Sequence, residues 1–241
     1  MKKIAFFVEG QTEMFFINRL LIEIAGQKNI SIQLIKLIGG KTVPKLETII
    51  PQSLKYVEPT NPKFYVLIYD SSSDNKVQSD ILDNLSNLKL AGYTEIIGLR
   101  DLFPSNISDL ENLKKGIEYF KNKNKPLLID YKIVIAVHEI EAWFISEHNH
   151  FLLIDTKLNC EFINEKLGIN LNNDDISLLY NPAKNLGKIY NLAGKGYGKT
   201  KQKKQVERTI EFLDYSNLYL NIRNKNKELN ELLTYIDDFF V

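Results

Sequence analysis

The sequence is poor in cysteine and lacks long apolar runs. Cys160 is the single cysteine in 241 residues, so no disulfide can form within the chain, and a reducing compartment is expected. No apolar stretch approaches the roughly 20 residues that span a bilayer, so no membrane association is expected. The apolar run after the basic start ends at Glu9, too early for a signal peptide. These absences predict a soluble, cytoplasmic protein.

An excess of charge of either sign is also missing. Lysine and arginine total 31 against 30 aspartates and glutamates, a net charge of +1. No field of the whole molecule therefore indicates a nucleic-acid or membrane partner. The lysines are nevertheless unevenly spread, because five of them fall within residues 195–204. A length of 241 residues fits one large domain or a domain with an appendage.

Apolar runs alternate with helical patterns through the first 148 residues. Continuous apolar runs at 4–8, 64–69 and 131–137 predict strands buried on both faces, and runs at 30–35 and 94–99 predict further strands. Helical patterns separate them at about 15–24, 43–56, 77–88 and 108–121. This order predicts an α/β fold, a mainly parallel sheet flanked by helices.

The remaining third of the chain has a different character. Asparagine and lysine become frequent, and helical patterns cover about 161–167, 183–192, 201–213 and 225–239. We therefore expect an α/β domain over residues 1–148 and a helical appendage over 149–241 that packs on it.

Acidic residues follow the three strongest strands. Glu9 comes directly after the first strand, and Gly10 offers a tight turn before a helix that Thr12 is expected to cap. Glu13 lies one helical turn later, so that its carboxylate can converge with that of Glu9. Asp70 ends the strand at 64–69.

The third strand leads into a further acidic segment, His138-Glu139-Ile140-Glu141. A single acid after a strand is usually a helix cap or a solvated loop residue. Three such ends in one parallel sheet share an edge, and ligands of open α/β sheets bind there. The pattern predicts a site for a divalent cation.

These motifs resemble a TOPRIM domain, the catalytic fold of topoisomerases and primases. The segment Val-Glu-Gly-Gln-Thr-Glu at 8–13 and the later acidic pair are closer to the OLD-type (overcoming lysogenization defect) TOPRIM nucleases. They are closest to a TOPRIM-like family linked to phage defence, with Glu-Gly-x-Thr-Glu near its start and His-Glu-Phe-Glu-Ala in its middle. His-Glu-Ile-Glu-Ala at 138–142 differs from the second motif at one position, and 181–186 resembles a Pro-Ser-Lys segment of that family. The resemblance covers most of the chain.

The resemblance implies a Mg²⁺-dependent nuclease that cuts phosphodiester bonds, with Mn²⁺ able to substitute. It also implies antiphage defence beside a separately encoded partner ATPase. The catalytic residues that it implies are Glu9, Glu13, Asp70, Glu139, Glu141 and Lys184, and the metal ligands are Glu9, Glu13, Asp70, Asp74 and Glu141. Here Lys184, or a later lysine, would stabilise charge on the transferring phosphate.

One position departs from the TOPRIM pattern. TOPRIM domains usually carry Asp-x-Asp, whereas Ser72 occupies the second position here and Asp74 follows two residues later. Whether the predicted site binds one metal ion or two therefore stays open. An alternative function follows, a nucleic-acid-binding or regulatory subunit whose catalytic site has decayed.

The segment at 193–200 nearly matches a phosphate-binding P-loop, but a helical pattern precedes it where a P-loop requires a strand. A flexible loop that contacts a nucleic-acid backbone is the preferred interpretation, and Tyr197 could stack on a base. The alternative is a solvated charge run. The contacting residues would be Lys195, Lys199, Lys201, Lys203 and Lys204.

Three histidines have structural or supporting interpretations. His138 is expected to hydrogen-bond the neighbouring carboxylates, and the pair His148 and His150 is interpreted as part of a polar linker. The substrate stays open between DNA and RNA, including a specific RNA such as tRNA, and homo-oligomerisation stays open as well.

Overall fold

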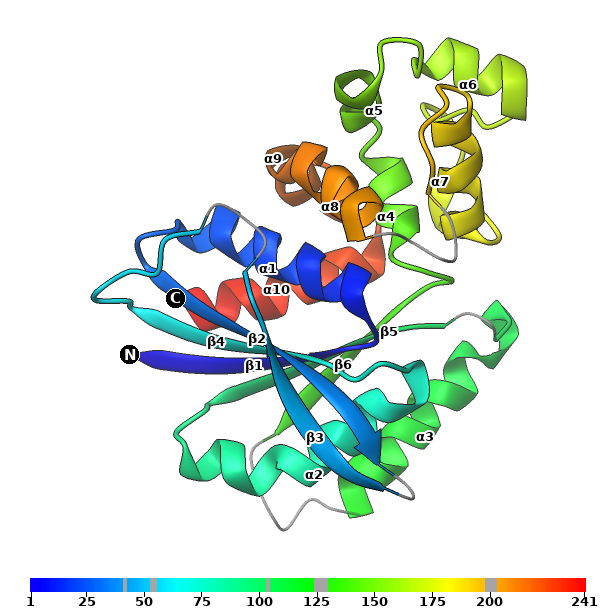
Figure 1. The fold of residues 1–241 in the computed structure, drawn as a ribbon. Coiled ribbons are helices and arrows are strands. Elements are labelled where there is room, and N and C mark those ends of the chain that lie inside the picture. Colours follow the sequence, from blue (N-terminus) through cyan, green and yellow to red (C-terminus); the bar gives the residue numbers. More distant parts are fainter. Residues whose placement is uncertain (41–42, 53–55, 103–104, 124–129, 198–202) are drawn as a thin grey trace. The chain divides into compact units, whose positions relative to one another are not determined.

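The computed structural model describes residues 1–40, 43–52, 56–102, 105–123, 130–197 and 203–241 (Figure 1). The chain divides into two compact units. Unit 1 comprises Met1–Arg100, Ser108–Ile135 and Tyr235–Val241, and unit 2 comprises Asp101–Ile107 and Ala136–Thr234. Because both units contain separate stretches of the sequence, compactness alone does not test the expected domains, and the division at 148/149 stays a prediction.

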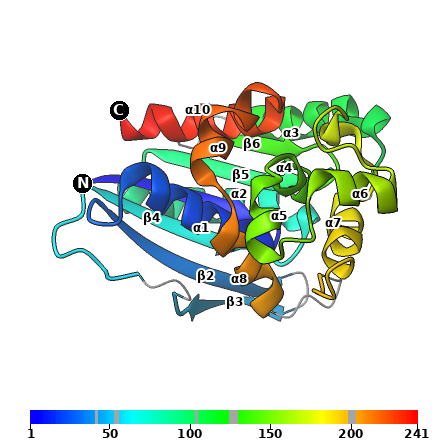
Figure 2. The same ribbon diagram turned by 90° about the horizontal axis from the view of Figure 1, so that it is seen from above.

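Six strands form one mostly parallel sheet, as the alternation of strands and helices predicted (Figure 2). Their order across the sheet is β3-β2-β4-β1-β5-β6. The strands are β1 (Lys2–Val8), β2 (Ile30–Gly40), β3 (Val43–Ile50), β4 (Phe64–Asp70), β5 (Glu95–Asp101) and β6 (Tyr131–Ala136). The pairs β1–β4, β1–β5 and β2–β4 are parallel.

Helices cover both faces of the sheet in unit 1. Helix α1 (Gln11–Ala25) lies on one face, and α2 (Val77–Leu90) and α3 (Leu110–Lys123) lie on the other (Figure 1). Short 3-10 turns, η1 (Asp74–Lys76) and η2 (Ile107–Asp109), precede α2 and α3. Ile81 of α2 belongs to a buried hydrophobic cluster that includes Phe7 of β1 and Tyr69 of β4. The rings of Phe7 and Tyr69 stack with their centroids 4.6 Å apart.

Strand β1 is the point at which the chain changes direction across the sheet. Helix α1 leads from β1 to β2 on one side, and α2 leads from β4 across β1 to β5 on the other side. In open α/β sheets, ligands bind outside the carboxyl ends of the strands at such a point. The segment after Val8 therefore lies where a ligand site is expected.

Two local predictions in unit 1 are wrong. Residues Val43–Ile50 form the antiparallel edge strand β3, not a helix, and Leu46 pairs with Ile38 of β2. Apolar residues in this segment are spaced three or four apart, as in an amphipathic helix. Its β-branched side chains and Pro44 favour an edge strand instead. The strand forms because the segment can pair with the otherwise unpaired edge of β2. In addition, Gly10 occupies the N-cap position of α1, and Thr12 is buried in the first turn.

Unit 2 is helical, as expected for most of the chain beyond residue 150. Its elements are α4 (Glu141–Ser146), α5 (Asn149–Ile154), α6 (Cys160–Leu167), η4 (Ile176–Leu178), α7 (Pro182–Asn191), α8 (Lys203–Phe212), α9 (Tyr215–Leu220), η5 (Ile222–Asn224) and most of α10 (Lys227–Phe240). Trp143, Phe144 and Phe151 are fully buried in it. In the described ranges of both units, no helix is long and apolar enough to span a membrane.

Candidate functional site

The turn after β1 presents two carboxylates in unit 1. Glu9 is half-buried beyond the strand, and Glu13 in the first turn of α1 is 6% exposed. Gly10 has an extended backbone, with φ −161°, so the turn itself does not require glycine. The space beside it is tight, because a Cβ at Gly10 would lie 3.3 Å from Oε2 of Glu13. The sequence at 9–13 therefore packs the Glu13 carboxylate closely against the turn that follows Glu9.

Asp70 ends the strand next to β1. In the parallel register Asp70 pairs with Val8, and the amide of Ser71 donates to the Val8 carbonyl at 2.9 Å. Glu9 and Asp70 thus follow neighbouring strand ends. The expectation that these two acids share one edge of the sheet is confirmed.

The turn after Asp70 is fixed by Ser72. The Ser72 amide donates to Oδ1 of Asp70 at 2.8 Å, and its hydroxyl donates to the Leu37 carbonyl at 3.1 Å. Its φ of 58° lies in the left-handed region, which is uncommon for a residue other than glycine. Ser72 thus orients Asp70 and ties the turn to β2. Asp74 begins η1, and its side chain is outside the described part of the structure.

Asp70 is a buried acid with an unusual proton affinity. It is 3% exposed, and burial raises the pKa of its carboxyl group. The Ser72 hydrogen bond and the positive charge of Lys36 lower the pKa in part. A carboxylate held out of water in this way is stabilised by a nearby cation, which is typical of functional sites.

The donor chemistry of Glu9, Glu13 and Asp70 fits a hard cation such as Mg²⁺. Among the residues that the structure describes, no three His, Cys, Asp or Glu side chains are grouped so that they could hold a metal ion together. Mg²⁺ does not require three, because it usually binds through one or two carboxylates and completes its shell with water and phosphate oxygens. The magnesium site stays a prediction.

In unit 2, the segment after β6 places its acids against different elements. Oε2 of Glu139 accepts a hydrogen bond from the Ala183 amide at 2.8 Å, in the first turn of α7. Oε1 of Glu141, which is 2% exposed, accepts one from the Tyr197 hydroxyl at 2.7 Å. Oδ1 of Asp101 accepts from the Ile140 amide at 3.2 Å and fixes the turn between them. Glu139 therefore stabilises the start of α7, and Glu141 is oriented by a tyrosine.

His138 has a strained backbone and a buried ring. Its φ is 62°, it is 5% exposed, and burial lowers the pKa of the imidazole. The Nδ1 atom has no hydrogen-bond partner among the described residues, and the ring meets that of Tyr180 edge-on at 5.9 Å. A hydrogen bond from Nδ1 to the neighbouring carboxylates, the supporting role expected for this residue, is not formed in the described structure.

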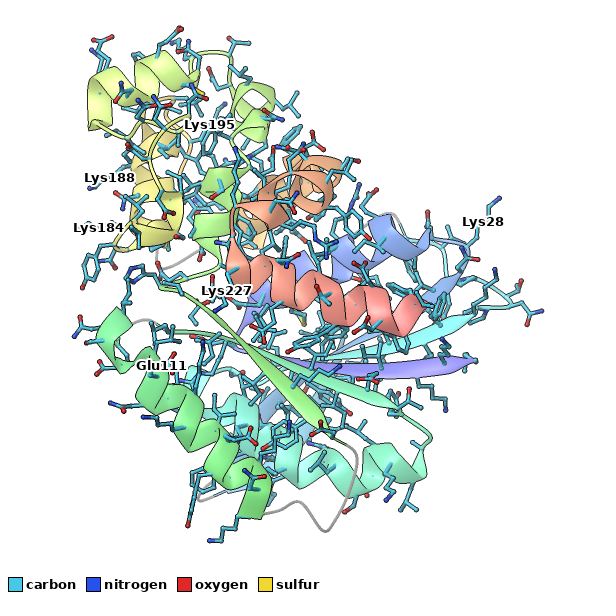
Figure 3. All side chains as sticks on the ribbon, turned by 180° about the vertical axis from the view of Figure 1, so that it is seen from behind. Lys28, Glu111, Lys184, Lys188, Lys195 and Lys227 are labelled. Atoms are coloured by element: carbon cyan, nitrogen blue, oxygen red, sulfur yellow. The ribbon has the colours of Figure 1, made fainter. Side chains whose placement is uncertain are left out.

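The lysines predicted to contact nucleic acid are only partly described. Lys184 and Lys188, four residues apart on α7, are exposed, and Lys195 follows the helix; all three are labelled in Figure 3. The structure does not describe Lys199 and Lys201, and of Lys203 and Lys204 it describes the backbone but not the side chains.

Two interpretations of unit 2 residues are wrong. Tyr197 is 5% exposed and bonded to Glu141, so it is not available to stack on a base. His150 is fully buried, not part of a polar linker, and bonds Glu147 at 3.0 Å and the Tyr190 hydroxyl at 3.0 Å. Tyr197 stands in a segment rich in glycine and lysine, and polar residues precede His150, which concealed the burial of both side chains.

A cavity of about 690 Å³ lies within unit 2, apart from these acids. Asparagines are the most frequent residues in its wall, Asp174, Asp175 and Lys225 add charged groups, and Leu171, Ile176 and Ile222 supply apolar surface. Asn149, Asn172, Asn173 and Asn221 are among the amides that line it. Its volume is in the range of small-molecule pockets.

The comparisons with known proteins place the chain in a family. The model of a domain of unknown function, DUF4276, matches residues 8–236. The chain belongs to this family. Comparisons with curated proteins and with solved structures each found no match. Because the family description names no activity, the function of this DUF4276 chain must be argued from its residues.

Two residues of this DUF4276 domain, Lys36 and Asp101, were not selected from the sequence, and Tyr197 was selected for a different role. Lys36 lies beside Asp70 on β2, Asp101 anchors the turn before α4, and Tyr197 orients Glu141. Asp101 could have been found, since it ends a strand as Asp70 does. No local pattern identifies Lys36 or Tyr197, because each acquires its neighbour only through folding.

Proposed function

We propose that this protein is a Mg²⁺-dependent nuclease that hydrolyses phosphodiester bonds of DNA or RNA. The observation that carries the proposal is the placement of Glu9 and Asp70 after neighbouring parallel strands at the turning point of the sheet. The burial of Asp70, which raises its carboxyl pKa, and the close packing of Glu13 against Gly10 support it. The resemblance to TOPRIM nucleases supports the choice of chemistry.

In this proposal the carboxylates of Glu9 and Asp70 would hold the cation, and Glu13 would accept a hydrogen bond from the attacking water. A bound Mg²⁺ would supply charge neutralisation on the phosphate and a more acidic water. Water adds to phosphorus, one P–O ester bond breaks, and the products are a phosphomonoester and a free hydroxyl. Ser72 keeps Asp70 in a fixed orientation through its amide, which reduces the reorganisation that the reaction requires.

By the same resemblance, Glu139, Glu141 and Lys184 take part in the chemistry, and the biological setting is antiphage defence with a separate ATPase. The glycines near 194 follow helix α7, whereas a P-loop follows a strand. An ATP-dependent trigger, which the resemblance implies, would therefore have to come from another protein. Phage plating with and without a neighbouring ATPase gene, in cells carrying wild type or Asp70→Asn, tests the setting.

The decisive experiment is a cleavage assay on supercoiled plasmid and total tRNA with Mg²⁺, Mn²⁺ or EDTA. We expect metal-dependent cutting by the wild type, no cutting by Glu9→Gln or Asp70→Asn, and full activity in Glu111→Gln. Glu111 is an exposed acid of α3 in the same unit, labelled in Figure 3, and serves as the matched control. Unchanged activity in both site variants would refute the nuclease.

The decayed-site alternative draws on Ser72, which fills the position of the second TOPRIM aspartate and has a structural role there. It predicts salt-sensitive nucleic-acid binding without turnover under any metal. Binding that persists in Asp70→Asn, together with no cleavage by the wild type with or without its ATPase, would favour this alternative.

A further inference from the structure

Lys36 lies beside Asp70 in the sheet of unit 1. The parallel register pairs Lys36 of β2 with Asp70 of β4, and Asp70 in turn with Val8 of β1. Residues paired across neighbouring strands point to the same face. Phe7 and Tyr69, one position earlier, face α2, so Lys36 and Asp70 share the opposite face, on which α1 lies.

The Lys36 ammonium group is not committed to the fold. It is half-buried and forms no hydrogen bond or ion pair with any residue in the described ranges. Nearby lysines are used differently, since Lys45 pairs with Asp80 and Asp83, and Lys76 donates to the Gly39 carbonyl at 3.0 Å. A half-buried cation without such a partner is available to an anionic ligand.

The charge of Lys36 nevertheless reaches the candidate site. It lowers the pKa of Asp70 in opposition to the larger effect of burial, which raises it. A lysine beside a metal-binding carboxylate can receive the phosphate oxygens that the metal does not neutralise. Fixed positive charge at that place stabilises the transition state of phosphoryl transfer.

We propose that Lys36 is a catalytic residue, and that its ammonium group contacts a non-bridging oxygen of the scissile phosphate. The inference rests on the proposed nuclease function and assigns to Lys36, which is paired with Asp70 in the sheet of unit 1, the phosphate contact that the resemblance gives to Lys184. The competing explanation is that Lys36 only keeps Asp70 ionised and thereby assists metal binding. The two explanations predict opposite changes in metal affinity.

The test compares Lys36→Met, Lys36→Arg and the control Lys28→Met in the plasmid and tRNA assays across a range of Mg²⁺ concentrations. Lys28 is an exposed lysine of the same unit, close to the amino end of β2 (Figure 3). We expect Lys36→Met to lower the maximal rate about 10²–10³-fold. The half-saturating Mg²⁺ concentration should fall, because a cation that repels the metal is removed. Lys36→Arg should recover part of the rate, and Lys28→Met should equal the wild type.

Other results separate failure of this inference from failure of the proposed function. If Asp70→Asn is inactive but Lys36→Met keeps the wild-type rate, or loses Mg²⁺ affinity with its maximal rate restored at high Mg²⁺, the inference fails and the nuclease stands. If Glu9→Gln and Asp70→Asn both cleave as the wild type does, the proposed function fails.

If the wild type cuts neither substrate, the inference is tested by a binding measurement instead. Fluorescence anisotropy of short labelled single-stranded DNA and RNA in EDTA then decides the phosphate contact. Weaker binding by Lys36→Met than by Lys28→Met, with equal melting temperatures, supports it. Equal binding by both variants overturns it.

Discussion

The hydroxyl of Tyr197 controls the orientation of Glu141 within unit 2. A neighbouring glycine helps to place it, because a Cβ at Gly187 would lie 2.4 Å from the Tyr197 carbonyl oxygen. The Gly196 carbonyl, one residue earlier, accepts a hydrogen bond from Arg208 at 2.8 Å. The described part of the glycine-rich segment, up to residue 197, is thus packed around a buried tyrosine.

We expect Tyr197→Phe to weaken metal binding or activity about 10–100-fold, the usual effect of removing a hydrogen bond to a metal ligand. The ring stays, so packing against Tyr190 at 5.8 Å is retained. Mn²⁺ binding followed by electron paramagnetic resonance measures the change, and Tyr219→Phe on α9 is the control. An unchanged affinity would show that Glu141 is not a ligand or does not require the tyrosine.

Gly10 allows a second prediction at the residue scale. Its extended backbone accepts alanine, but the new Cβ would lie 3.3 Å from Oε2 of Glu13 and displace that carboxylate by a few tenths of an ångström. Gly10→Ala should therefore leave the melting temperature close to that of the wild type and reduce cleavage. Gly116→Ala in α3, where no atom lies within 4 Å of the new Cβ, should stabilise the protein by about 0.5–1 kcal/mol and keep full activity. Full activity in Gly10→Ala would contradict a role for Glu13.

Among the elements, the short helices of unit 2 are joined by a buried polar network. The Glu147 side chain accepts hydrogen bonds from the Asp214 amide and the Asn217 side chain, each at 3.2 Å, and pairs with His150. Nε2 of His150 is hydrogen-bonded to the Tyr190 hydroxyl, and this hydroxyl is hydrogen-bonded to the Thr209 hydroxyl at 3.0 Å. Helices of six to ten residues have little stability alone, so these contacts connect α5, α7, α8 and α9.

Removing one member of this network should be strongly destabilising. Glu147→Ala leaves His150 and two amide donors without their buried acceptor, and we expect the free energy of unfolding to fall by about 3–5 kcal/mol. Urea denaturation measures the change. The exposed pair of Arg19 and Glu23 on α1 is the comparison, since Glu23→Ala should lose only about 0.3–0.5 kcal/mol. A loss below 1 kcal/mol in Glu147→Ala would contradict the network's role.

At the scale of the whole molecule, the near-neutral charge hides a local concentration of lysine. The net charge is +1, yet α7 carries the exposed Lys184 and Lys188, and Lys195 follows the end of this helix (labelled in Figure 3). If they contact phosphates, replacing all three with glutamine should weaken DNA or RNA binding. The slope of log affinity against log salt concentration should then decrease in magnitude by about 2 to 3.

Anisotropy titrations at several salt concentrations measure this slope. The control removes the same number of charges from exposed positions elsewhere, at Lys28, Lys89 and Lys227. Equal slopes for the two triple variants would show that the lysines beside α7 form no specific nucleic-acid contact.

The sequence by itself determined the strands and their acidic ends. The continuous apolar runs that became β1, β4 and β6 are local properties, and so are the acids that follow the first two. The helical character of the second part of the chain was equally local. An α/β sheet with Glu9 and Asp70 at one edge could therefore be predicted without coordinates.

Only the tertiary structure decided which strands and side chains are neighbours. It placed β1 between β4 and β5, paired Lys36 with Asp70, and made residues 43–50 an edge strand instead of a helix. It also brought Tyr197 to Glu141, 56 residues away. Strand order, register and side-chain partners depend on packing between segments distant in the chain, and the periodicity of a single segment contains no information about that packing.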